Sequence, residues 1–84
     1  MNDAMLECEA LKVLGRRQCL VSTDALWREV SFRLERHITN YEFGFMMCKL
    51  ERLGLVSRSN TALMREVWAI TDKGRQALKE EMGR

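Results

Sequence analysis

A chain of 84 residues is long enough for one domain with one modest hydrophobic core, since it buries only about 60 to 65% of its unfolded surface. Hydrophobic residues make up 46% and charged residues 31%, which excludes a disordered tail and predicts a single folded domain over residues 1–84. The formal net charge of +2 is too small to indicate a nucleic-acid partner by its size alone.

The expected location is the cytoplasm. No apolar run approaches the roughly 18 residues of a membrane span, so no membrane association is expected. The first nine residues hold three acidic side chains, whereas a signal peptide begins with basic ones. Cys8, Cys19 and Cys48 are odd in number and lack CxxC spacing, which indicates reduced thiols rather than disulfides or a zinc site.

The first predicted helix covers residues 3 to about 15. Its inner face consists of apolar residues at helical spacing, namely Leu6, Ala10, Val13 and Leu14, with Leu11 at the border. Gly15 is placed to end this helix. Residues 19–21 are too short for another helix and end in a β-branched residue, which predicts a short strand.

The second predicted helix is capped by Ser22 or Thr23 and runs to about Glu35. Its inner face is formed by Leu26, Val30 and Leu34, with Trp27 at the margin. His37, the only histidine, is expected to cap the end of this helix rather than to serve a metal or nucleophilic site. Only residues 36–38 separate it from the next helix, so the pair is predicted to form a helix-turn-helix.

The third helix, residues 39–53, has the strongest local signals. Thr39 is a favoured N-cap, and Glu42 can return a hydrogen bond to the backbone amide of the cap. The predicted buried stripe is Phe43, Met46, Met47, Leu50 and Leu53. Gly54 then stands where a left-handed helix end is usually formed.

A hairpin and a last helix complete the predicted order. Residues 55–58 read as a strand, residues 57–65 as a polar loop bracketed by Arg58 and Arg65, and residues 66–70 as a second strand. The positive charge is concentrated here, because residues 55–75 contain four basic and two acidic side chains. Thr71 is expected to cap the last helix, whose apolar positions are Ala77, Leu78 and Met82.

Two motifs then resemble a known family. Residues 50–58 (LERLGLVSR) resemble the junction of recognition helix and wing in repressors of the MarR and PadR kind, and residues 70–74 (ITDKG) resemble the segment that leads from their wing into the next helix. The resemblance implies an α+β, mostly helical winged helix-turn-helix fold with a three-helix core, a β-hairpin wing and a C-terminal helix. It also implies a transcriptional regulator that binds double-stranded DNA, commonly as a homodimer.

On this resemblance, the helix of residues 39–53 enters the major groove and the wing of residues 56–70 contacts the backbone or minor groove. Asparagine can pair with adenine, phenylalanine can touch a thymine methyl, and lysine or arginine can reach guanine or phosphate. The predicted DNA-binding residues are Asn40, Tyr41, Gly44, Phe45, Lys49 and Arg52 on the helix, and Arg58, Asn60 and Arg65 in the wing.

The outer face of this helix departs from the family pattern, because Tyr41 and Phe45 make it unusually apolar. An alternative function is therefore a protein-interaction winged helix that docks a protein partner through Tyr41 and Phe45, with Leu63 and Met64 at the loop tip. No paired carboxylates, activated nucleophile or phosphate-binding loop indicates an enzyme, and no metal or cofactor is expected. For the homodimer, the surplus apolar residues are predicted to be Leu6, Leu11, Leu78 and Met82.

Overall fold

The computed structural model describes residues 4–17 and 20–82, with side chains up to residue 80. The elements in chain order are α1 (Ala4–Arg16), β1 (Val21–Ser22), α2 (Thr23–Leu34), α3 (Asn40–Arg52), β2 (Val56–Asn60), β3 (Glu66–Ile70) and α4 (Asp72–Met82). The strands form an antiparallel sheet in the order β1-β3-β2. The predicted fold class, four helices with a small sheet, is thereby confirmed.

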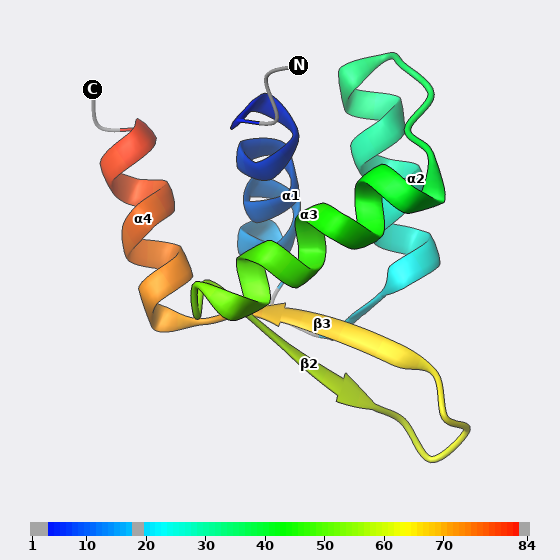
Figure 1. The fold of residues 1–84 in the computed structure, drawn as a ribbon. Helices are drawn as coiled ribbons and strands as arrows, with labels where there is room; N and C mark the ends of the chain where they lie inside the picture. Colours follow the sequence, from blue (N-terminus) through cyan, green and yellow to red (C-terminus); the bar gives the residue numbers. More distant parts are fainter. Residues whose placement is uncertain (1–3, 18–19, 83–84) are drawn as a thin grey trace.

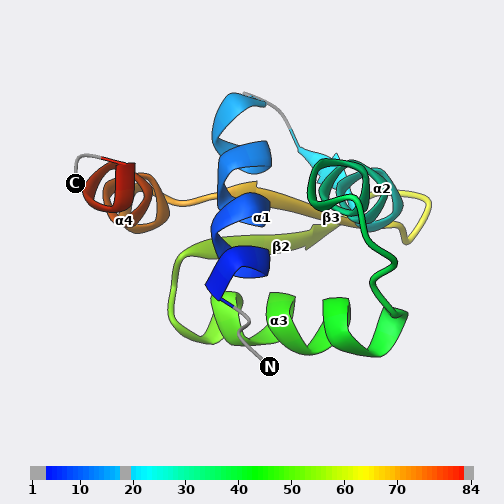
Figure 2. The ribbon, with the colours of Figure 1, turned by 90° about the horizontal axis from the view of Figure 1, so that it is seen from above.

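Helix α1 is the centre of the domain. Figure 1 and Figure 2 show it between α4 and α2, with α3 crossing its face and the β2–β3 hairpin projecting away from the helices. Its predicted inner face is buried, and so is Leu11. Among the helices of the described residues, none is long and apolar enough to cross a membrane.

Helix α1 also corrects two predictions. It continues through Gly15 to Arg16. Gly15 leaves room for α4, since an ideal Cβ there would lie 3.0 Å from the Cδ2 atom of Leu78. Leu6 and Leu11 belong to the common core, so they are not the surplus apolar surface that was assigned to a dimer. Leu78 is partly buried against this core, and the side chain of Met82 lies outside the described residues.

The predicted short strand of residues 19–21 is found at Val21–Ser22 and ends one residue later than predicted. Val21 pairs with Trp68 and Ser22 pairs with Val67 at one edge of β3, while Cys19 lies outside the described residues. Ser22 is also the N-cap of α2, because its hydroxyl accepts a hydrogen bond from the N–H of Ala25 at 3.3 Å. Ser22 therefore belongs to the sheet and also caps the start of α2.

The turn between α2 and α3 is fixed by the backbone and by one indole. Helix α2 is capped at Glu35, whose φ of 52° is left-handed and whose N–H donates to the carbonyl of Phe32 at 3.2 Å. The cap is therefore the backbone at Glu35 rather than the predicted side chain of His37, which is exposed. The Nε1–H of Trp27 donates to the carbonyl of Ile38 at 2.7 Å, and the Ile38 side chain is buried.

The start of α3 largely follows the prediction. The Thr39 hydroxyl accepts a hydrogen bond from the N–H of Glu42 at 3.0 Å. The Glu42 carboxylate accepts from the Thr39 hydroxyl at 3.3 Å, instead of from the backbone amide of the cap, and its other oxygen lies 3.7 Å from Arg36. One carboxylate thus supports both the cap and the preceding turn.

The end of α3 forms a Schellman motif. The N–H of Gly54 (φ 79°) donates to the carbonyl of Glu51, and the N–H of Leu55 donates to that of Leu50, both at 3.0 Å. The predicted stripe is buried up to Leu50. Leu53 was wrongly included, since its side chain is 47% exposed: it stands at the helix end and at the edge of the stripe.

The first strand of the wing is longer and the loop shorter than predicted, while β3 covers residues 66–70 as predicted. Strand β2 extends to Asn60 because each of its residues pairs with β3, leaving residues 61–65 as the loop. Arg58 therefore lies within a strand, opposite Trp68, whereas Arg65 is the last residue of the loop. Beyond β3, the Thr71 hydroxyl accepts a hydrogen bond from the N–H of Gly74 at 3.0 Å, which confirms Thr71 as the cap of α4.

Candidate nucleic-acid interface

The outer face of α3 carries a shallow surface pocket opposite the buried stripe. Tyr41 is 84% exposed and Phe45 is 68% exposed. The pocket is lined by Asn40, Tyr41, Gly44, Phe45, Cys48, Lys49 and Arg52. The structure thus brings together all six of the predicted helix residues and adds Cys48, whose spacing of three and four from Phe45 and Gly44 already places it on this face.

Gly44 leaves this face open at its middle. Apart from Gly44, its two chain neighbours and the adjacent backbone of α3, no atom lies within 4 Å of an ideal Cβ at this position. Glycine in a helix interior costs roughly 0.5–1 kcal/mol relative to alanine, so α3 gives up stability here without any internal steric reason. The missing side chain lets a docked molecule approach the α3 backbone between Tyr41 and Phe45.

The two basic residues of the face differ in their surroundings. The Lys49 Nζ atom lies 2.8 Å from the Glu7 Oε1 atom of α1, so part of its charge is neutralised inside the protein. Arg52 is exposed in the last turn of α3. Both side chains line the pocket and carry their charge at the end of a long, flexible chain.

The wing tip presents a second exposed group of residues. Asn60 and Arg65 are exposed, as are Leu63 and Met64 within the loop. The loop is held by its own backbone, because the N–H of Thr61 donates to the carbonyl of Arg65 at 2.9 Å. Met64 has a φ of 62°, a left-handed conformation that disfavours residues with a side chain.

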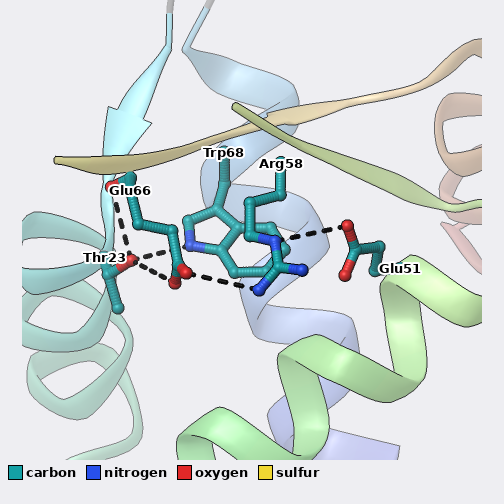
Figure 3. A network of polar contacts seen from close by, with 5 residues as sticks. All are labelled: Thr23, Glu51, Arg58, Glu66 and Trp68. Atoms are coloured by element: carbon teal, nitrogen blue, oxygen red, sulfur yellow. Dashed lines mark hydrogen bonds and ion pairs between the residues drawn. The ribbon is translucent and has the colours of Figure 1, made fainter. Parts of the chain in front are cut away.

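Arg58 differs from the other predicted wing residues because it has several partners (Figure 3). Its Nη1 atom lies 3.3 Å from the Glu66 Oε2 atom, and its Nε atom lies 3.4 Å from the Glu51 Oε2 atom. Its guanidinium carbon stands 5.8 Å from the centre of the Trp68 ring. These contacts join both strands of the wing to the last turn of α3, a link that no local sequence pattern indicated.

In the part of the chain that the structure describes, no group of three or more His, Cys, Asp or Glu side chains is placed to hold a metal ion. The site residues are instead amide, aromatic, thiol, ammonium and guanidinium groups. Such groups are able to form hydrogen bonds, apolar contacts and charge contacts.

Comparison with known proteins identifies the fold. No protein-family model and no curated sequence matches this chain. The structure of RosR from H. salinarum has a TM-score of 0.84 at 21% identity, covering 95% of this chain and 70% of RosR. A PadR-like transcriptional regulator from Bacillus cereus has a TM-score of 0.78 at 18% identity, covering 93% of this chain and 78% of that protein.

The transcriptional regulator BldR from Sulfolobus solfataricus is 28% identical, with a TM-score of 0.68, and the match covers 89% of this chain but 50% of BldR. The chain therefore spans about half the length of BldR and more of RosR. These likenesses confirm the predicted winged helix-turn-helix fold and its resemblance to PadR-type regulators. In that fold, α2 and α3 are the helix-turn-helix and the β2–β3 hairpin is the wing.

Proposed function

We propose that this protein is a DNA-binding transcriptional regulator in which α3 enters the major groove and the wing contacts the backbone. The observation that carries the proposal is the exposed outer face of α3, which holds six of the predicted contact residues beside the wing. The similar proteins BldR and the PadR-like protein of Bacillus cereus are named transcriptional regulators. The expected cytoplasmic location fits this role.

Each group on the face has a part in the proposal. Asn40, at the start of α3, pairs with adenine, and Phe45 contacts a thymine methyl with Tyr41 beside it. Lys49 and Arg52 reach guanine or phosphate from the second half of the helix. At the wing, Asn60 and Arg65 contact the sugar-phosphate backbone, which positions the helix without reading sequence.

A homodimer is part of the proposal because two recognition helices about 34 Å apart would read successive major grooves. Leu6 and Leu11 cannot form its interface, since both are buried within one copy. Exposed apolar side chains that are available for such an interface include Met5 on α1 and Leu53 after α3. Sedimentation at high micromolar concentration tests the dimer, and a species of 9.8 kDa would contradict it.

Fluorescence anisotropy with a labelled mixed-sequence duplex at about 50 and 200 mM salt tests DNA binding. We expect the affinity to fall steeply with salt, because each phosphate contact releases counterions. Arg65→Ala should weaken binding to every duplex and reduce the salt slope by about 1. Lys79→Ala removes the same charge from α4, away from the interface, and should change neither quantity; equal behaviour of the two variants would remove the wing tip from the interface.

The exposure of Tyr41 and Phe45 favours a second candidate function, a winged helix that docks a protein. An apolar interface loses little affinity as salt rises, whereas a phosphate interface loses much. A salt-insensitive complex with a protein, together with no binding to duplex or genomic DNA fragments at the lower salt concentration, would favour this second function.

A further inference from the structure

The Arg58 side chain bridges two elements through two different nitrogens. Its Nε atom faces Glu51 at the end of α3, and its Nη1 atom faces Glu66 on β3. Figure 3 shows the guanidinium between these carboxylates, over the Trp68 ring. One cation therefore faces two anions, and the cluster as a whole carries a net negative charge, which is unsuited to attracting a phosphate.

The Trp68 indole beneath Arg58 is itself held in place. The Trp68 side chain is buried, and its Nε1–H donates to the Thr23 hydroxyl at 2.8 Å. That hydroxyl can in turn donate to the Glu66 Oε1 atom at 3.1 Å. The indole and one of the two carboxylates are thus tied to the start of α2, which leaves Glu51 as the contact that connects this assembly to α3.

We propose that Arg58 is a positioning residue, which sets the wing against the last turn of α3, rather than a residue that contacts phosphate. This inference rests on the proposed function, because its consequence is that the wing and α3 meet the same duplex. A lysine cannot replace Arg58 in this role. The planar guanidinium presents separate donors to the two carboxylates, whereas an ammonium is a single point charge.

The two roles of Arg58 make opposite predictions for Glu51→Gln. If Arg58 contacts phosphate, then Glu51 competes with DNA for it, and removing the Glu51 charge should strengthen binding more when Arg58 is present than when it is absent. If Arg58 positions the wing through Glu51, the same change should strengthen DNA binding less when Arg58 is present than when it is absent, or should weaken it. The sign of this difference separates the roles, because the general effect of removing a negative charge near DNA cancels in the comparison.

The experiment is a double-mutant cycle on the full chain with the wild type, Glu51→Gln, Arg58→Ala and the double variant. Affinity for a mixed-sequence duplex of about 30 base pairs, roughly three helical turns, is measured at low salt. We expect Glu51→Gln to be less favourable by about two- to fivefold with Arg58 than without it, the range for an exposed ion pair. We also expect Arg58→Lys to bind as weakly as Arg58→Ala, although it keeps the charge.

Melting temperatures of all variants show whether each is folded at the assay temperature, and Arg58→Lys replaces Arg58→Ala in the cycle if the alanine variant is not. The positioning role would be overturned if Glu51→Gln changed the affinity equally with and without Arg58, or strengthened binding more with Arg58 than without it. Wild-type affinity in Arg58→Lys would also overturn it. Absence of duplex binding by the wild type at low salt would overturn the proposed function together with this inference. The two failures are therefore distinguishable.

Discussion

The α-carbon of Gly74 lies against the carbonyl of Leu55, where an ideal Cβ would be only 2.0 Å from the oxygen. The same carbonyl accepts the N–H of Thr71 at 3.1 Å, and the Thr71 hydroxyl donates to the carbonyl of Gly54 at 2.6 Å. The two motifs that indicated a winged helix, residues 50–58 and 70–74, thus contact each other at the base of the wing. The junction explains why the second motif has glycine at position 74, where a side chain would not fit, and threonine at position 71, where a hydroxyl is used.

Gly74→Ala should lower the free energy of unfolding by about 3 kcal/mol, at the upper end of the range for overpacking, because the added methyl meets backbone rather than a movable side chain. Urea unfolding measures this loss. The matched control is Gly44→Ala, since the space around Gly44 is open. Equal stability of Gly74→Ala and the wild type would contradict the close approach to Leu55.

Gly44→Ala should raise the free energy of unfolding by roughly 0.5–1 kcal/mol and yet weaken DNA binding. The stability gain follows from the lower backbone entropy of alanine in the unfolded chain, and the binding loss from a methyl placed between α3 and the groove. Denaturant unfolding and anisotropy titrations on the same sample measure both. Gln76→Ala, on the exposed surface of α4, should leave DNA binding unchanged. Tighter binding by Gly44→Ala would exclude close approach at this position.

Thr39→Ala should cost roughly 1 kcal/mol, because the N–H of Glu42 loses its hydrogen bond to the Thr39 hydroxyl. Thermal unfolding measures the loss. Thr39→Ser keeps the hydroxyl and should retain most of the stability. If the alanine and serine variants melted at the same temperature as the wild type, the cap would contribute nothing to the stability of α3.

Phe45→Ala should leave stability within about 0.5 kcal/mol of the wild type, since the Phe45 side chain is 68% exposed and leaves no core cavity. Affinity for the best-binding genomic fragment should fall by about 1 to 3 kcal/mol, and affinity for random duplexes should fall much less.

Phe32→Ala is the matched control, because Phe32 is 82% exposed on α2, away from the outer face of α3. A stable Phe45→Ala variant with unchanged affinity for that fragment would remove Phe45 from the base contacts.

The sequence by itself determined the helices and the outer face of α3. The cap at Thr39, the turn at Gly54 and the stripe from Phe43 to Leu50 all depend on residues within about seven positions of one another. The same rotation of about 100° per residue that buries Phe43 places Tyr41 and Phe45 outward. Local chemistry was therefore sufficient to locate the candidate interface before any tertiary contact was known.

Tertiary structure alone decided the length of β2, the passage of α1 through Gly15 and the partners of Arg58. Ser57 and Asn60 are polar and favour a loop by composition, but pairing with β3 supplies the backbone hydrogen bonds that make them a strand. Arg58 looked like a free cation because its carboxylates come from two other elements. The indole beneath it is held by Thr23, 45 residues away in sequence, a separation at which no local pattern carries information.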